Sequence, residues 1–228
     1  MPDRWRWIPS ERPGMHFLGA PRQHEIALEL GMGRGRCALQ LFLQGATVLG
    51  VELAFERYRK ALEAMERLAH RCPEELRVSF QNSKARLMGA NTQTGFMEVR
   101  YGDFFQIVKD EEIAAATLIF LQVCLPRASW PSVRSFLEHC SPGCRVLTFQ
   151  ACGEQGGETR GPSSFPFRDI GSPVLACTWA TAGHRFHCYE RLDLEEERRI
   201  LERSGLRPEH LPQTRKTCDE RQGWLRAA

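Results

Sequence analysis

The sequence predicts one α/β domain: a mostly parallel, seven-stranded sheet with helices on both faces and a terminal antiparallel strand pair. Short apolar runs alternate with helical segments along the chain, which is the pattern of parallel strands joined by crossover helices. A length of 228 residues suits one such domain. The composition, 42% hydrophobic and 26% charged, is typical of a globular protein.

Each strand is predicted from an apolar run bounded by turn residues. The seven predicted strands cover residues 25–30, 47–52, 96–101, 117–123, 144–150, 174–179 and 185–192. Apolar residues at helical spacing predict the main helices, which cover residues 36–43, 54–70, 129–139 and 194–204. Residues 74–94 are interpreted as a further helix. Residues 152–173 are rich in Gly, Pro and Ser and are interpreted as a long loop.

The ends of the chain differ in composition from the domain, which we expect to span residues 25–205. Residues 1–24 are rich in Pro, Arg and Trp and predict an N-terminal arm or cap, and residues 206–228 predict a polar C-terminal tail. The net charge of +3 permits a nucleic-acid partner without arguing for one. The scattered basic residues of the tail favour a solvated surface over nucleic-acid contact.

Cysteine usage indicates an intracellular, reducing compartment. The nine cysteines are odd in number, and no two have C-x-x-C spacing. Two groups could be imagined as metal ligands, but no metal is expected. His139, Cys140 and Cys144 have no second ligand pair at zinc-finger spacing, and a strand with alternating faces explains His184, His187 and Cys188 better. The first residues lack the apolar core of a signal peptide, and no apolar run reaches the ~18 residues of a membrane span.

A glycine-rich stretch between the first strand and the first helix is the strongest functional signal. Gly31, Gly33 and Gly35 alternate there, and glycine lets a ligand approach the backbone closely. The dinucleotide fingerprint places a third glycine where Arg36 stands. Glu29 precedes the loop, and its carboxylate would repel a pyrophosphate but attract a sulfonium or ammonium group. The loop therefore favours S-adenosyl-L-methionine over a nicotinamide dinucleotide.

Acidic residues at the end of the second strand and just after the third strand predict the rest of a cofactor site. Glu52 is placed to accept hydrogen bonds from both ribose hydroxyls, with a solvated strand-end acid as the alternative. Asp103 is placed to accept from an adenine amino group, and Phe104 to stack on the ring. The alternative for this pair is a turn aspartate before a core phenylalanine. Parallel strands bring all these residues to one edge of the sheet, where open α/β sheets bind ligands.

With these motifs the sequence resembles the class I, seven-strand methyltransferases that use S-adenosyl-L-methionine. Within them it is most similar to the non-SET histone lysine methyltransferases of the disruptor-of-telomeric-silencing type. The segments that carry this resemblance are Glu29–Gly35, Gly50–Glu52, Gly102–Phe104, Leu118–Gln122, and Trp179 with Gly183 and Tyr189. The resemblance implies that Glu29 lies near the methionine end of the cofactor. It also implies that Gly31, Met32, Gly33 and Gly35 cradle the cofactor.

The resemblance also implies an acceptor site. In that family the fourth strand ends in two asparagines followed by aromatics, whereas this chain has Gln122, Val123, Cys124 and Leu125. Gln122 is then expected to position the acceptor, and Trp179 and Tyr189 to wall its channel, with Cys188 as the alternative register. The implied substrate is a protein, a histone in a nucleosome, and the implied location is the nucleus, with the cytoplasm as the alternative.

Three further hypotheses stay open at this point. The chain could be a methyltransferase for a non-histone substrate, which the altered residues after Gln122 favour. It could also be a cofactor-binding homologue without catalysis. A nicotinamide dehydrogenase is disfavoured by Glu29 and Arg36. No pattern in the sequence predicts the oligomeric state.

Overall fold

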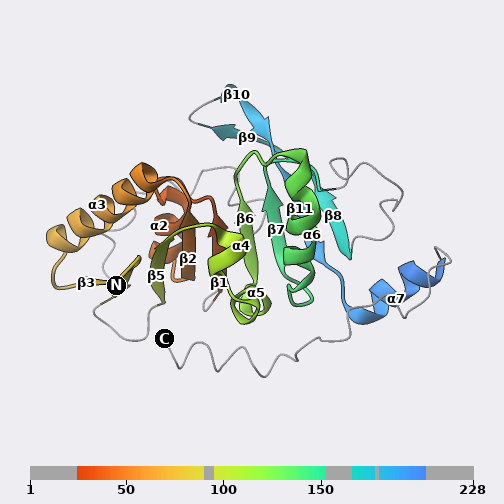
Figure 1. Cartoon of the computed structure of the whole chain (residues 1–228), viewed down its shortest axis with the longest axis horizontal. Coiled ribbons are helices and arrows are strands. Elements are labelled where there is room, and N and C mark those ends of the chain that lie inside the picture. Colours follow the sequence, from red (N-terminus) through yellow and green to blue (C-terminus); the bar gives the residue numbers. More distant parts are fainter. Residues whose placement is uncertain (1–24, 90–94, 153–165, 178–179, 204–228) are drawn as a thin grey trace.

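A nine-stranded mixed sheet forms the centre of the protein, in the order β3-β4-β5-β2-β1-β6-β7-β11-β8 (Figure 1). The structure, a computed structural model, describes residues 25–89, 95–152, 166–177 and 180–203. The strands of the main sheet are β1 (Ile26–Leu30), β2 (Thr47–Glu52), β3 (Leu76–Gln81), β4 (Lys84–Gly89), β5 (Phe96–Tyr101), β6 (Leu118–Leu121), β7 (Arg145–Thr148), β8 (Phe167–Gly171) and β11 (His187–Arg191). A separate two-stranded sheet contains β9 (Val174–Cys177) and β10 (Ala180–Arg185).

Helices follow most of the parallel strands. They are α2 (Arg36–Leu43), α3 (Phe55–Arg71), α4 (Phe104–Ile107), α5 (Asp110–Ala115), α6 (Trp130–Glu138) and α7 (Leu194–Arg203), with a 3-10 helix η2 (Arg127–Ser129) before α6. The predicted helices over residues 36–43, 54–70, 129–139 and 194–204 are therefore confirmed within a residue or two at their ends.

The five central strands, β5-β2-β1-β6-β7, are all parallel. This is a doubly wound order, because the chain moves outward from β1 to one side and then returns to fill the other side. The direction of winding changes between β1 and β6, and such a switch point leaves a crevice at the carboxyl ends of the two strands. The five strands predicted for this part of the sheet are confirmed.

Both faces of the sheet are covered, as predicted for an α/β domain. Successive residues of a strand point to opposite faces. On one side Ala27 packs with residues of α2 and α3 such as Leu41 and Met65. On the other side Leu28 packs with Val133 of α6. All residues of β1 and β2 are buried, which explains why the two strands are apolar except for Glu29 in β1 and for Thr47 and Glu52 at the ends of β2.

The prediction of a helix in residues 74–94 is wrong. Residues 76–81 and 84–89 form the antiparallel hairpin β3-β4, which extends the sheet beside β5. The physical reason is a period of two: within β4, Ala85 and Leu87 are buried and alternate with more exposed residues. The turn places Asn82 at a φ of 53°, a conformation that asparagine adopts more readily than most residues. Residues 90–94 lie outside the described residues.

The C-terminal strands also pair differently from the prediction. Within the described residues, the expected partner strands, residues 174–179 and 185–192, pair with each other only at Val174 and Arg185. Instead β11 inserts antiparallel between β7 and β8, while β9 pairs with β10. The strand β8 lies in residues 152–173, which were predicted to be a loop. The sheet is therefore mixed and nine-stranded rather than seven-stranded, because β3 and β4 extend one edge and β11 and β8 extend the other.

Two predictions about the ends of the chain stay untested. The predicted N-terminal arm, residues 1–24, and the predicted tail, residues 206–228, lie outside the described residues. Within the described residues, no helix combines the length and the apolar character needed to cross a membrane.

Candidate active site

The glycine loop between β1 and α2 has the backbone that its sequence predicts. Gly31, Gly33 and Gly35 have φ angles of 74°, 61° and 68°, in the left-handed region that favours glycine. The backbone N–H groups of Gly31 and Met32 donate to the carbonyl of Val51 at 2.9 and 3.0 Å. The loop is thus attached to the last residues of β2, at the carboxyl edge of the sheet.

The individual loop residues have different surroundings. A Cβ on Gly31 would lie 2.0 Å from Cγ1 of Val123, so packing requires glycine there. A Cβ on Gly33 would meet no atom within 4 Å, so this glycine faces open space. The Met32 side chain is buried and packs against Gly50, so only its backbone could contribute to the predicted cofactor cradle. Gly33 is therefore the loop position that a ligand can approach.

Glu29 lies beneath the loop and caps helix α2. Its carboxyl oxygen Oε2 accepts a hydrogen bond of 2.6 Å from the backbone N–H of Ala38, in the first turn of the helix. Gly35 begins this helix and has no side chain to cap it, so an acid from β1 supplies the acceptor. The pKa of Glu29 is raised to about 8, mainly by burial; the Ala38 hydrogen bond acts against this rise, and the nearby charge of Glu52 adds to it.

Glu52 connects the glycine loop to the turn after β2. Its Oε2 accepts from the backbone N–H of Gly33 at 2.7 Å, and its Oε1 accepts from that of Ala54 at 2.8 Å. The side chain is 5% exposed at the carboxyl end of β2. A carboxylate offers about four lone-pair sites, so two acceptor sites remain for donors such as ribose hydroxyls.

Asp103 and Phe104 begin helix α4 after β5. Asp103 is half-buried, and its Oδ1 accepts from the backbone N–H of Phe105 at 3.0 Å, an N-cap interaction. The backbone N–H of Gly102 donates to the carbonyl of Glu52, so the ends of β5 and β2 meet as predicted. The Phe104 ring packs against Phe105 and Phe136 in the core, at centroid distances of 4.3 and 5.7 Å.

For Phe104 the alternative interpretation, a core phenylalanine after a turn aspartate, describes the structure. The first residue of a short helix points inward here because α4 has to cover the sheet beside α6. The predicted stacking of Phe104 on adenine is therefore not supported, since the ring is 9% exposed and its faces are taken by other phenylalanines.

Gln122 lies at the carboxyl end of β6, on the far side of the switch point from Glu52. Its side chain is half-buried, and within the described part of the chain no hydrogen bond engages its amide. The loop that follows it is held in place from two sides. Val123 packs on Gly31, and the backbone N–H of Leu125 donates to Oε1 of Gln150 at 2.8 Å.

Of the two residues predicted to wall the acceptor channel, Tyr189 lies away from this edge of the sheet. Tyr189 is 7% exposed in the middle of β11, where it pairs with Val146, and its hydroxyl accepts from the backbone N–H of Cys152 at 3.1 Å. The register of β11 instead brings His187 to the carboxyl edge, opposite Thr148. Cys188, the alternative for Tyr189, is fully buried. Trp179 lies outside the described residues.

Sequence reasoning missed an aromatic cluster beside Gln122. Phe149 follows β7, and the ring of His184 from β10 stacks on it with centroids 3.6 Å apart and planes 8° apart. Nε2 of His184 lies 3.1 Å from the carbonyl oxygen of Phe149, and Phe186 packs edge-on against both rings. An aromatic residue directly after a predicted strand could have drawn attention to Phe149. Its pairing with His184 depends on the β9-β10 hairpin.

A second missed group lies beside Glu52. Leu53, Phe55 and Tyr101 are exposed by 66%, 54% and 40%, although all three are large and apolar. The rings of Phe55 and Tyr101 pack edge to face, with centroids 5.5 Å apart. These residues leave an apolar surface at the carboxyl ends of β2 and β5, where the adenine end of a nucleoside cofactor is expected. The signal in the sequence was an apolar residue directly after a strand-end acid.

The carboxyl edge therefore combines two kinds of surface across the switch point. One side has an open glycine backbone, a carboxylate with spare acceptor sites, and exposed apolar side chains. The other side has an amide and an aromatic cluster. Among the described residues there is no group of three or more His, Cys, Asp or Glu side chains suited to holding a metal ion. The arrangement suits a nucleoside-like cofactor lying beside a second substrate.

No family model matches the chain, and no curated protein matches its sequence. Some solved structures are similar to this chain at low sequence identity. An RNA methyltransferase from Salinibacter ruber in complex with S-adenosyl-L-homocysteine shares 18% identity, over 82% of this chain and 95% of that chain, with a TM-score of 0.49. A SAM-dependent methyltransferase from Methanosarcina mazei shares 16% identity, over 75% of this chain and 94% of that chain, with a TM-score of 0.46.

A third similar structure is magnesium protoporphyrin IX methyltransferase from Synechocystis PCC 6803 with bound SAM. It shares 10% identity, over 74% of this chain and 71% of that chain, with a TM-score of 0.45. Similarity at this level assigns neither a cofactor nor a substrate to this chain.

Proposed function

We propose that this chain is an S-adenosyl-L-methionine-dependent methyltransferase. The observation that carries the proposal is the position of Glu52. Its carboxylate is buried at the carboxyl end of β2, holds the Gly33 N–H group, and keeps acceptor sites for ribose hydroxyls beside the open face of that glycine. A strand-end acid next to a glycine loop at a switch point is the geometry in which doubly wound folds hold the ribose of a nucleoside cofactor.

The remaining residues of this half of the edge fit the same cofactor. Asp103 has a second carboxylate oxygen for an amino group of adenine, and the exposed side chain of Leu53 offers an apolar face to the ring. When bound, the cofactor supplies an electrophilic methyl group on a sulfonium. The carboxylate of Glu52 beside the loop favours a positively charged cofactor over the pyrophosphate of a dinucleotide.

For the acceptor we propose a protein lysine, with a histone in a nucleosome as the first candidate and the nucleus as the location. The support is the family resemblance, together with the Gln122 amide at the end of β6. Methyl transfer is an in-line displacement that depends on alignment and exclusion of water. The carbonyl oxygen of Gln122 would accept a hydrogen bond from the neutral amine. The stacked Phe149 and His184 would cover the apolar part of the acceptor.

Two measurements test this proposal in order. Calorimetry compares S-adenosyl-L-homocysteine with NAD, and we expect binding of the first and none of the second. Incubation with methyl-labelled cofactor then compares nucleosomes, free histones and total lysate, with label expected on protein. Label on RNA or small molecules alone would exclude the protein-lysine proposal. Tight binding of NAD without binding of S-adenosyl-L-homocysteine would exclude S-adenosyl-L-methionine as the cofactor.

A methyltransferase for another substrate is the second candidate. The observation that favours it is the packing of Val123, which follows Gln122 and contacts Gly31 instead of presenting a second amide to the acceptor. A non-histone protein in the lysate would then carry the label. Binding of the cofactor without transfer to any of these pools would support the remaining alternative, a homologue without catalysis.

A further inference from the structure

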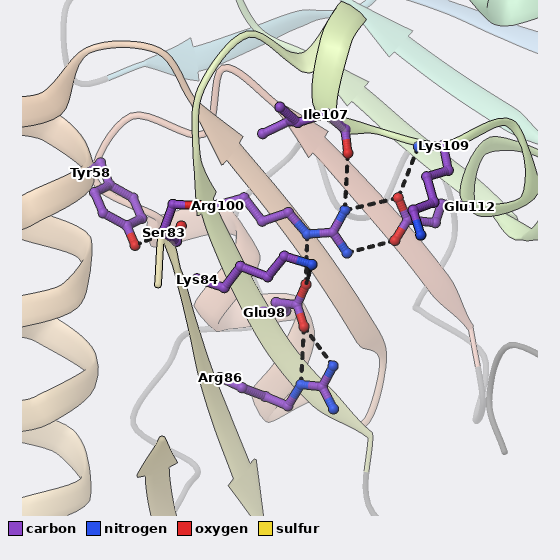
Figure 2. Close-up of polar contacts among 9 residues, drawn as sticks. All are labelled: Tyr58, Ser83, Lys84, Arg86, Glu98, Arg100, Ile107, Lys109 and Glu112. Carbon is purple, nitrogen blue, oxygen red and sulfur yellow. Dashed lines mark hydrogen bonds and ion pairs between the residues drawn. The ribbon is translucent and has the colours of Figure 1, made fainter. Parts of the chain in front are cut away.

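Arg100, on β5, is a buried arginine at the centre of a hydrogen-bonded network (Figure 2). Its Nε donates to Oε1 of Glu98 at 2.6 Å. Its two terminal nitrogens donate to the two carboxylate oxygens of Glu112, at 2.9 and 2.5 Å. Nη1 also donates to the backbone carbonyl of Ile107 at 3.3 Å. The guanidinium group thus contacts three different parts of the chain.

Two of these contacts close a loop around Asp103. The segment from Gly102 to Glu112 begins directly after Tyr101, the last residue of β5, and contains helix α4. Arg100 holds the end of α4 through Ile107 and the body of α5 through Glu112, which also accepts from the backbone N–H of Lys109 at 3.0 Å (Figure 2). The side chain of Arg100 therefore connects strand β5, which precedes the segment that carries Asp103, to the far end of that segment.

The other half of the network provides a natural comparison. Glu98, 4% exposed, also accepts from Arg86 of β4, through Nη2 at 2.5 Å and Nε at 3.1 Å. Burial alone would raise the pKa of Glu98, but the hydrogen bonds from Arg86 and Arg100 outweigh it and the pKa is lowered. Arg86 and Arg100 therefore share the carboxylate of Glu98. The contacts to α4 and α5 described above are made by Arg100.

We propose that Arg100 is a positioning residue for the cofactor site. By joining β5 to α4 and α5, Arg100 holds Asp103 at the edge of the sheet. The inference rests on the proposed function, because Asp103 matters only if a ligand binds at this edge. A planar guanidinium can direct donors to Glu98, Glu112 and Ile107 at once. Lysine keeps the charge but has one nitrogen, so it cannot reproduce this geometry.

The test compares Arg100→Lys with Arg86→Lys in the full chain. Both variants replace by lysine an arginine that donates to Glu98. Of the contacts described above, only those of Arg100 reach the segment around Asp103, so only the first variant removes them. Calorimetry with S-adenosyl-L-homocysteine should show affinity weakened about tenfold or more for R100K, since small misplacements in a binding site have effects of this order. R86K should lower the melting temperature and leave the affinity near that of the wild type.

A double-mutant cycle with Asp103→Asn separates positioning from a general loss of stability. Asparagine can keep the cap on Phe105 while it replaces the other carboxylate oxygen by an amide donor. If Arg100 acts through Asp103, then R100K should weaken binding much less in the D103N background than alone. Equal losses in the two backgrounds, or equal affinities of R100K and R86K, would overturn the proposal.

Glu112→Gln gives an independent variant if R100K does not fold. It keeps one acceptor for Arg100 and should weaken cofactor binding in the same direction, again with less effect in D103N; unchanged affinity for E112Q would contradict the inference. Absence of binding to the wild-type chain would instead contradict the proposed function itself, so the two failures are distinguishable.

Discussion

The backbone N–H of Gly33 donates a hydrogen bond of 2.7 Å to the carboxylate of Glu52, a residue that is nineteen positions further along the chain. Together with the bonds from Gly31 and Met32 to the carbonyl of Val51, this bond joins the glycine loop after β1 to the end of β2. It also orients the carboxylate, because the second oxygen is held by Ala54. Loop conformation and ligand recognition are thus coupled in one side chain.

Glu52→Gln should therefore weaken binding of S-adenosyl-L-homocysteine by about tenfold or more, because one acceptor oxygen becomes an amide donor that faces an N–H group. Glu52→Ala should in addition lower the free energy of unfolding by about 1–3 kcal/mol, since two backbone donors lose their partner. Calorimetry and urea unfolding measure the two effects. Glu56→Gln on the exposed side of α3 is the control and should change neither the affinity nor the free energy of unfolding. Unaltered binding by E52Q would show that Glu52 does not contact the ligand.

Two glycines of the loop should respond differently to alanine. Gly31→Ala adds a methyl group that collides with Val123, so it should destabilise the fold by about 2 kcal/mol or more, from overpacking and left-handed backbone together. Gly33→Ala meets open space and should cost about 1 kcal/mol, from the backbone alone.

G33A should weaken ligand binding more than G31A does, although it destabilises the fold less. The reason is that the methyl group of G33A projects toward the side from which a cofactor would approach. Thermal unfolding and calorimetry on the same samples provide the comparison. Val123→Ala should partly restore the stability of G31A. A G33A variant that binds S-adenosyl-L-homocysteine like the wild type would show that the open space is not the ligand site.

Glu29 should make the stability of the protein depend on pH. Its pKa is raised from 4.5 to about 8 by burial, so the fold favours the protonated carboxyl. The resulting stabilisation is fully present below about pH 4.5 and is lost as the pH rises through 8, at about 1.4 kcal/mol per unit of pKa difference. Glu29→Gln imitates the neutral form and keeps an acceptor for Ala38.

Urea unfolding between pH 5 and 9 measures this effect. The wild type should lose stability with rising pH relative to E29Q, and the two curves should diverge most near pH 9. Glu66→Gln, an exposed position of α3, should leave the wild-type slope intact. Parallel curves for the wild type and E29Q would mean that Glu29 does not titrate in this range.

Gln122→Ala should lower kcat/KM for the acceptor by about tenfold or more without changing cofactor affinity. The reason is that its amide makes no hydrogen bond within the described structure, so its removal withdraws an orienting group and little stability. Steady-state kinetics with labelled cofactor and the best substrate pool measures the effect, and melting curves control for folding. Normal turnover and unchanged acceptor selectivity in Q122A would exclude the assignment.

Tyr189→Phe should show the opposite behaviour. Loss of the hydroxyl removes the acceptor for the backbone N–H of Cys152 and should cost about 1 kcal/mol of stability. Acceptor kinetics should stay near the wild type, because the ring lies in the core and not at the strand edge. A large fall in turnover with an unchanged melting temperature would restore Tyr189 to the channel.

The parts of the fold that were predicted correctly are those with strong local periodicity. The buried strands β1 and β2 are apolar along their length, and α3 has a long amphipathic repeat, so their type follows from neighbouring residues alone. The hairpin β3-β4 was missed because its alternating pattern, with Leu76, Val78 and Phe80 in β3, is short and resembles the spacing of a frayed helix. Strand β8 was missed because it is short and lies among Gly, Pro and Ser.

For the site, the sequence by itself determined which chemical groups reach the carboxyl edge: the loop glycines, Glu52, Asp103 and Gln122 each follow a strand that local pattern identifies. Only the tertiary structure decided how they are used. It turned Glu29 toward a helix terminus and Phe104 into the core, and it placed His187 rather than Tyr189 at the edge. The physical reason is that strand register and burial depend on partners far away in the chain, and a shift of one residue reverses the face to which every side chain of a strand points.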